Sequence, residues 1–129
     1  MKKKYLVVIA DYYKDISKGL LKSALDLLPK TCLIKIIIVP GVFEIPLTIA
    51  KNIKKYDGFL ALGCVIKGQT PHFDFISQAS TDAIMKLAIE HKKPIGNGII
   101  TCLNMKQAIA RKKKGREAAE AVISVLSQK

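Results

Sequence analysis

The segment from Gly68 to His72 joins an apolar run to a stretch with helical periodicity, and its residue types could bind an anion and move a proton. Thr70 suits an N-cap and Pro71 the first helical position, where a missing N–H costs nothing. Free N–H groups at Gly68 and Gln69 would then face outward beside the positive end of the helix, as in an anion site. The helix dipole would favour a neutral His72 imidazole, which could accept a proton as a general base. Taken alone, the segment favours an ordinary helix start whose histidine caps or packs.

A second group of candidate residues is the basic run from Arg111 to Gly115. Arg111 could chelate a phosphate through two parallel N–H bonds, whereas Lys114 would supply a point charge. The alternative is a solvated charge run at the end of a helix. The choice depends on whether these cations converge on a site.

Three further residues could bind a flat ligand that carries hydroxyl groups. Tyr12 and Phe43 could stack on a heterocycle, or simply belong to the core. Glu44 could accept hydrogen bonds from a polyol, or favour the N-terminus of a following helix. His91 lies in a charged run and should face solvent. The sequence has no Ser/His/Asp order, no GxGxxG and no clustered carboxylate pair, which argues against hydrolysis and dinucleotide binding.

The elements that must position these residues alternate along the chain. Strands are expected over residues 5–10, 32–39, 58–65 and 94–102. Helices are expected over 16–28, 44–54 and 76–88, then over 106–111 and 117–126 with a break near Gly115. Continuous apolar strands joined by helical crossovers predict an α/β fold with a parallel sheet buried on both faces. Ligands bind outside the carboxyl ends of such strands, which is where the unusual residues of this sequence fall.

The size and composition of the chain limit what it can be. Its 129 residues, 50 % of them apolar, fit a single domain with one sizeable core. The apolar stretches are too short to cross a bilayer, because they are interrupted by Lys35, Lys51, Lys54 and Lys67. The cysteines lack the CxxC spacing of a zinc site and suit free thiols in a reducing compartment: Cys32, Cys64 and Cys102. We therefore expect a soluble cytoplasmic protein that binds no membrane and no metal.

The formal net charge of +12 could indicate a nucleic-acid partner. Of the 22 basic residues, however, only Arg111 and Arg116 are arginines, whereas proteins that read bases usually depend on the guanidinium group. No RNP-like, helix-turn-helix or zinc-finger pattern accompanies the charge. Phosphorylated small molecules are therefore the expected anionic partners, and nucleic acid is not.

From about Tyr5 to Leu126 the chain resembles the lumazine synthase family. The most specific stretches are VPGVFEIP (Val39–Pro46) and GCVIKGQTPHFDF (Gly63–Phe75), with weaker support from Gln107–Arg111 and from Lys114-Gly115 followed by Glu117–Ala119. The resemblance implies a flavodoxin-like, three-layer α/β/α fold with a central parallel four-stranded sheet. It also implies one lumazine synthase domain over residues 1–129.

The resemblance further implies a reaction in riboflavin biosynthesis. In it 5-amino-6-(D-ribitylamino)uracil condenses with 3,4-dihydroxy-2-butanone 4-phosphate to give 6,7-dimethyl-8-ribityllumazine, inorganic phosphate and water. The expected course is imine formation, phosphate elimination to an enol, ring closure and dehydration. No cofactor is implied, and much of the catalysis should come from holding two substrates in alignment.

By the same resemblance, specific residues bind the pyrimidine substrate. Tyr12 matches the aromatic position against the pyrimidine ring. The other matches line the pyrimidine pocket, at Val65, Ile66 and Lys67, or hold the ribityl chain, at Val42, Phe43 and Glu44.

Other residues of the resemblance bind phosphate and move protons. His72 matches the proton-transfer histidine, Gln69-Thr70 the phosphate loop, and Arg111 the phosphate-binding arginine. Lys114 matches the lysine near the ribityl and pyrimidine groups. The residues at Asn97, Arg111 and Lys114 would come from a neighbouring subunit.

The sequence also departs from the family pattern. Tyr12-Tyr13 replaces the usual Phe-Asn or Trp-Asn, Val42 replaces a common Ala, and Asn97 stands where a Phe often contacts the pyrimidine. The turn from Arg111 to Gly115 is shorter than in many shell-forming members, and the strand ahead of Tyr5 is nearly absent. We therefore expect a homopentamer, with a sixty-subunit shell as the alternative.

The sequence leaves three other functions open. An archaeal-type riboflavin synthase shares the fold but would convert lumazine itself. A flavin-binding relative without activity would need neither a base at His72 nor a phosphate clamp at Arg111. A basic RNA-binding module would reveal itself by a steep salt dependence of binding.

Overall fold

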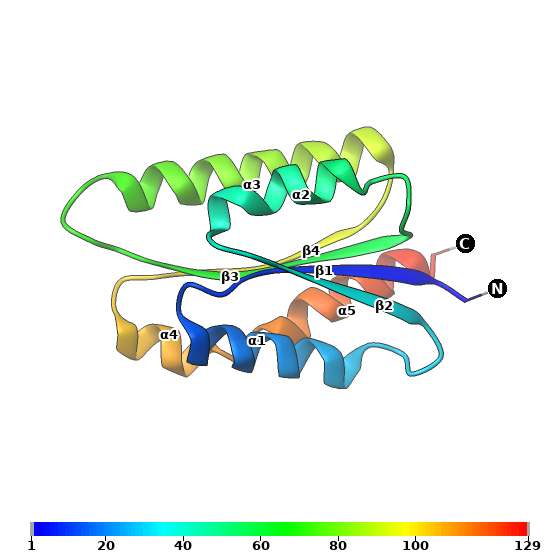
Figure 1. Cartoon of the computed structure of the whole chain (residues 1–129), viewed down its shortest axis with the longest axis horizontal. Coiled ribbons are helices and arrows are strands. Elements are labelled where there is room, and N and C mark those ends of the chain that lie inside the picture. Colours follow the sequence, from blue (N-terminus) through cyan, green and yellow to red (C-terminus); the bar gives the residue numbers. More distant parts are fainter. Residues whose placement is uncertain (1, 129) are drawn as a thin grey trace.

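The computed structural model describes residues 2–128 and has a four-stranded parallel sheet between two layers of helices (Figure 1). The strands are β1 (Lys4–Ala10), β2 (Leu33–Val39), β3 (Gly58–Ile66) and β4 (Ile95–Cys102). The helices are α1 (Lys14–Leu27), α2 (Ile45–Lys51), α3 (His72–His91), α4 (Met105–Arg111) and α5 (Gly115–Leu126), and a 3-10 turn, η1, covers Val42–Glu44.

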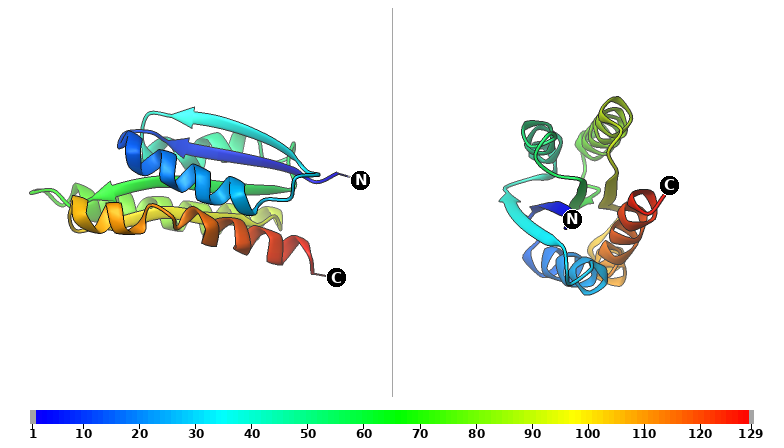
Figure 2. Two further views of the ribbon diagram at one scale, coloured as in Figure 1. Left: turned by 90° about the horizontal axis from the view of Figure 1, so that it is seen from below. Right: turned by 90° about the vertical axis from the view of Figure 1, so that its right-hand side faces the viewer.

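The strands lie in the order β2-β1-β3-β4, and all neighbouring pairs are parallel. Helices α1, α4 and α5 cover one face of the sheet, and α2 and α3 cover the other (Figure 2). The prediction of a flavodoxin-like, three-layer α/β/α fold is therefore confirmed. Because all strands run the same way, their carboxyl ends meet at the end of the molecule away from residues 2 and 128 (Figure 1).

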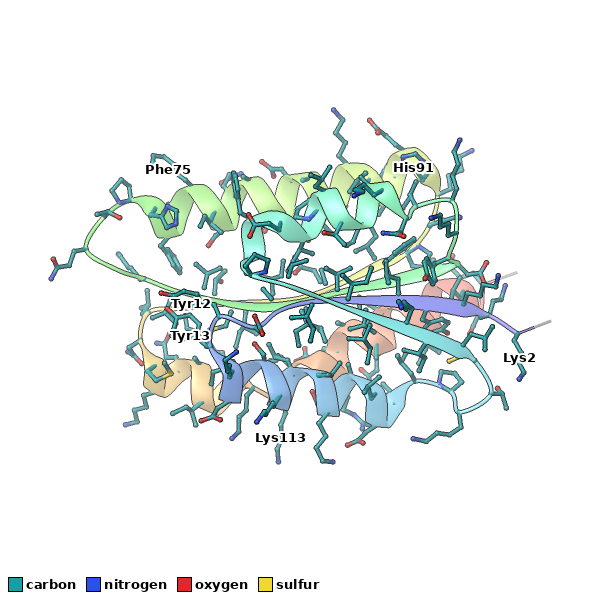
Figure 3. All side chains as sticks on the ribbon, in the orientation of Figure 1. Lys2, Tyr12, Tyr13, Phe75, His91 and Lys113 are labelled. Carbon is teal, nitrogen blue, oxygen red and sulfur yellow. The ribbon has the colours of Figure 1, made fainter. Side chains whose placement is uncertain are left out.

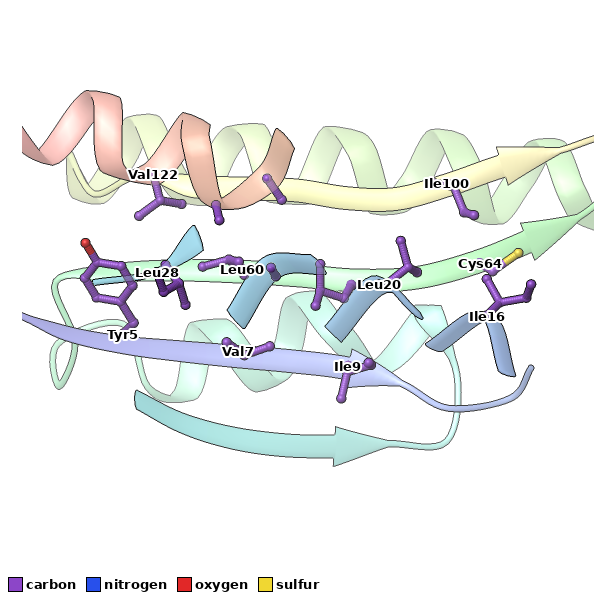
Figure 4. Close-up of a cluster of buried hydrophobic side chains, with 14 of the residues drawn as sticks. Tyr5, Val7, Ile9, Ile16, Leu20, Leu28, Leu60, Cys64, Ile100 and Val122 are labelled. Atoms are coloured by element: carbon purple, nitrogen blue, oxygen red, sulfur yellow. The ribbon is translucent and has the colours of Figure 1, made fainter. Parts of the chain in front are cut away.

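The two central strands are stabilised by burial. All side chains from Tyr5 to Ala10 and from 58 to 65 are buried. Because successive strand residues point to opposite faces, Val7 and Leu60 pack towards α1 and α5 (Figure 4), whereas Val8 and Ala61 pack in the cluster under α2 and α3. Each fully buried Val or Leu side chain contributes about 1.5–3 kcal/mol, so β1 and β3 anchor both layers.

The expectation that every strand is buried on both faces is wrong for both edge strands, for β4 at Asn97 and Thr101 and more widely for β2. Four apolar side chains of β2 are exposed, with Ile38 at 64 %: Leu33, Ile34, Ile36 and Ile38. The crossovers put β2 at the edge of the sheet, where the helices no longer cover it. The apolar run in the sequence could not distinguish an edge strand from a central one.

The helix expected over residues 44–54 is shorter than predicted. Glu44 belongs instead to the separate turn η1, and α2 extends only from Ile45 to Lys51, with Pro46 near its start as its missing N–H permits. The other expected helices and the break before Gly115 are confirmed to within a few residues. In the described part of the chain, no helix is both long and apolar enough to span a bilayer.

Candidate active site

A cavity of about 300 Å³ lies at the carboxyl ends of β1 and β3, beside the start of α3. Eight residues line it: Tyr12, Tyr13, Val42, Cys64, Val65, Ile66, His72 and Ile76. Five of them are predicted site residues, and they come from four separate segments of the chain. The cavity therefore lies where the rule for parallel sheets predicts a ligand site.

A larger groove of about 700 Å³ lies elsewhere, between α1 and the α4–α5 region. Charged side chains dominate its lining, including Lys18, Lys22 and Lys113. None of the predicted site residues lines this groove. The smaller cavity is therefore the candidate active site, on the basis of its residues rather than its size.

His72 is the first residue of α3 and has an exposed side chain at the cavity. The predicted cap is displaced by one residue, because Pro71 occupies the N-cap position and not the first helical position. The Thr70 hydroxyl still accepts a hydrogen bond from the His72 backbone N–H, at 3.4 Å. This contact holds the loop against the start of the helix.

The loop between β3 and α3 is open to solvent. Lys67, Gly68, Gln69 and Thr70 are all exposed, and nothing lies within 4 Å of the position where a Gly68 side chain would begin. The Lys67 N–H donates to the carbonyl of Cys102 on β4, at 2.9 Å, which fixes the start of the loop. The loop therefore borders the cavity without filling it.

Turn η1 presents its three residues in different directions. Val42 is buried and lines the cavity, whereas Phe43 is 65 % exposed and Glu44 is exposed. Gly63 makes room for Val42, because a Cβ on Gly63 would lie 2.9 Å from Val42 Cγ2. Of this segment, only Val42 lines the cavity within one chain.

Eight of the thirteen predicted site residues do not line the cavity of their own chain. Five of these eight belong to η1 or to the loop before α3, and the other three are Asn97, Arg111 and Lys114. Asn97 lies within β4, where its Oδ1 accepts a hydrogen bond from the Ile99 N–H at 3.0 Å. The Arg111 Nη1 donates to the Thr101 carbonyl at 3.2 Å, and Lys114 pairs with Glu117 at 2.8 Å. Within the chain, these residues do not meet His72 at the cavity.

The turn that carries Arg111 and Lys114 is fixed at Gly115, the first residue of α5. A Cβ at Gly115 would overlap with the backbone oxygen of Leu20 in α1. Only glycine permits this approach, so the identity of residue 115 positions the basic turn.

Three lining residues were not predicted from the sequence: Tyr13, Cys64 and Ile76. Ile76 follows His72 by one helical turn, so helical spacing places both on one face and could have identified it. Burial, with the neighbouring Cys102 thiol, raises the pKa of the Cys64 thiol to about 12. At neutral pH the Cys64 thiol is therefore protonated. It lines the cavity but does not act as a nucleophile.

Comparison with known proteins gives a consistent result. The chain matches the sequence model of the 6,7-dimethyl-8-ribityllumazine synthase family over residues 2–129. A 6,7-dimethyl-8-ribityllumazine synthase of Bartonella bacilliformis is 43 % identical over 134 residues, which cover 96 % of this chain and 88 % of that protein. The enzyme of the same name from Agrobacterium fabrum is 42 % identical over 137 residues, covering 96 % and 93 %. That of Bartonella henselae is 45 % identical over 134 residues, covering 96 % and 86 %.

Proposed function

Because the chain belongs to the 6,7-dimethyl-8-ribityllumazine synthase family, we propose that the cavity beside His72 is the site where it forms 6,7-dimethyl-8-ribityllumazine. The protein is a transferase of riboflavin biosynthesis that joins 5-amino-6-(D-ribitylamino)uracil to 3,4-dihydroxy-2-butanone 4-phosphate. The observation that carries the site assignment is the convergence of Tyr12, Val42, Val65, Ile66 and His72 on one cavity. Residues 1–129 then form one lumazine synthase domain.

The pyrimidine binds at the apolar wall of the cavity. Tyr12 stacks on its ring, Val65 and Ile66 contact it from the end of β3, and Lys67 lies at its edge. The ribityl chain extends towards η1, where the exposed Glu44 carboxylate accepts hydrogen bonds from its hydroxyls. His72 lies at the same cavity and transfers protons during imine formation, phosphate elimination and ring closure.

The phosphate of the second substrate binds at the loop from Lys67 to Thr70, which is open to solvent. Within the described residues 2–128, no lysine or arginine lines the cavity, although a dianion needs charge-assisted donors. One N–H of Arg111 donates to the Thr101 carbonyl, and its other N–H groups can donate to a phosphate. Since Arg111, Lys114 and Asn97 lie outside the cavity of their own chain, we propose that a neighbouring subunit supplies them.

Oligomerisation accords with the family and with the exposed apolar surface of the chain. The exposed side chains include the row on β2 and large residues on η1, α2 and α3, namely Phe43, Leu47, Phe75, Met85 and Ile89. So many large apolar groups left in water favour association with further copies. The assembly proposed here is a homopentamer of the cytoplasm, with the sixty-subunit shell as the alternative.

The test of the function is an assay with both substrates. When both substrates are mixed with the protein, the absorbance of lumazine should rise. The amount of lumazine formed should equal the amount of inorganic phosphate released. Lumazine given alone should remain unconverted, which separates this reaction from that of a riboflavin synthase. Formation of lumazine no faster than in the absence of protein would overturn the assignment.

The assembly has its own test. Sedimentation in solution should give a particle of about five times the 14.2 kDa chain mass. A monomer that keeps full activity would contradict the site shared between subunits.

A further inference from the structure

Tyr12 and Tyr13 make an aromatic contact at the rim of the cavity (Figure 3). Their ring centroids are 4.9 Å apart and the ring planes meet at 82°, which is an edge-to-face pair. Tyr12 is 75 % exposed, so the chain gives it little other support. Among the residues that the structure describes, Tyr13 is the one aromatic ring paired with that of Tyr12.

The fold holds Tyr13 much more firmly than Tyr12. The Tyr13 side chain packs against the buried cluster between the sheet and α1, and its carbonyl accepts the Ser17 N–H at 2.9 Å. The Ser17 hydroxyl donates to the Ala10 carbonyl at 2.7 Å, which ties α1 to the end of β1. Burial raises the pKa of Tyr13, with smaller effects from Cys64 and Tyr12, as expected for a ring that lies between a buried thiol and an exposed aromatic.

We infer that Tyr13 is a positioning residue for the pyrimidine substrate, because its fixed ring holds the exposed Tyr12 ring in one orientation for stacking. The inference rests on the proposed function, in which Tyr12 contacts the pyrimidine. An exposed side chain loses rotamer freedom when a ligand stacks on it, and that loss weakens binding. A ring that is already oriented loses less, so the Tyr12–Tyr13 contact strengthens binding of the pyrimidine and leaves the chemical steps unaffected.

The test is a double-mutant cycle on the KM for the pyrimidine. An edge-to-face pair accounts for about a two- to tenfold difference in an equilibrium. Tyr13→Leu should therefore raise the KM for the pyrimidine by about this factor. Turnover at saturation and the KM for the butanone phosphate should stay the same. Tyr13→Phe keeps the ring and should retain the low KM. In a Tyr12→Ala background, Tyr13→Leu should cause no further rise.

A matched control is Tyr56→Leu, at the amino-terminal end of β3 and away from the cavity. Tyr56 forms a similar edge-to-face pair with Phe59, with centroids 6.1 Å apart and planes at 72°. This variant loses an aromatic pair without touching the site, so its KM for the pyrimidine should not change. NMR of ring-labelled tyrosine supplies a readout independent of activity, since Tyr13→Leu should remove the ring-current shift of Tyr12.

Several results would overturn the inference. An equal rise in KM with and without Tyr12 would mean that Tyr13 contacts the substrate directly. An unchanged KM in Tyr13→Leu, or an unchanged Tyr12 resonance, would mean that the ring contact orients nothing. In each case the wild-type enzyme would still make lumazine, and the proposed function would stand. A wild type that makes no lumazine would instead overturn the function and this inference together.

Discussion

Gly115 lies so close to the carbonyl oxygen of Leu20 that no side chain would fit between α5 and α1. The same residue begins α5, directly after the short turn that links Arg111 at the end of α4 to Lys114. The packing of α5 against α1 therefore fixes the position of Arg111 and Lys114, two residues proposed to bind substrate.

Gly115→Ala should destabilise the protein and displace this turn. The added Cβ would overlap with a backbone oxygen, which can move only with α1, so a loss of about 1–3 kcal/mol is expected. Urea unfolding of the variant measures the loss. Gly68→Ala is the control, because nothing lies within 4 Å of a Cβ at Gly68. Equal stability of the two variants would contradict the close contact.

Arg111→Ala should raise the KM for the butanone phosphate far more than the KM for the pyrimidine. Loss of a charge-assisted phosphate contact costs about 1.5–3 kcal/mol, or roughly a ten- to hundredfold change in affinity. Steady-state kinetics with each substrate varied in turn would measure the two KM values. Arg116→Ala is the matched control, since Arg116 is exposed and lies near Glu120, at 3.9 Å, rather than at the cavity. Equal weakening towards both substrates would argue against a phosphate role for Arg111.

His72→Ala should lower turnover while product binding is retained. A general base contributes roughly 10² to 10⁴ in rate, although alignment by other residues and the uncatalysed condensation mask part of this. His91→Ala, at the opposite end of α3, is the control and should turn over normally (Figure 3). Unchanged turnover in His72→Ala would leave that histidine with a structural role at the helix start.

Mixed assemblies of His72→Ala and Arg111→Ala chains should recover activity. If two subunits share each site, dissociation and reassembly create some interfaces with an intact His72 facing an intact Arg111. Sites contained within one chain would gain nothing, because every chain carries one defect. Activity that stays at the level of the separate variants, despite verified subunit exchange, would refute the shared site but not the fold.

Stability should fall in alkali as the pH rises above about 9. In the folded protein burial raises the pKa of Cys64 to about 12 from an ordinary value of 9.0, so the unfolded chain releases this proton first. The stability that the protonated Cys64 thiol contributes is complete below its pKa in the unfolded chain. It is lost as the pH rises from 9 to 12. Cys64→Ala should reduce the slope of the urea midpoint against pH. Part of the slope should remain, because burial also raises the pKa of Tyr5 and Tyr13.

Much of the fold could be predicted because each strand is a mainly apolar run and each long helix repeats at helical spacing. The edge position of β2 could not, because Ile36 and Ile38 are as apolar as the residues of β3. Burial depends on which strand lies beside which, and that order follows from the crossovers rather than from the run itself.

The candidate site divides in a similar way. Tyr12 and His72 could be proposed from a strand exit and a helix start, whereas Val65 and Ile66 were implied only by the family resemblance; all four line the cavity. Tyr13 and Cys64 were missed, because their place depends on how the end of β1 approaches β3. Sequence motifs indicate what Arg111 and Lys114 could bind. Within one chain, however, the fold does not bring them to the cavity beside His72.

The unpaired edge of β2 makes any chain outside its assembly prone to aggregation. Its outer row of backbone N–H and C=O groups can pair with the same edge of another stray chain, and four exposed aliphatic side chains favour that pairing. Chains released when the assembly dissociates should therefore be lost to fibrils or precipitate, while the protein that stays assembled keeps its helical signal.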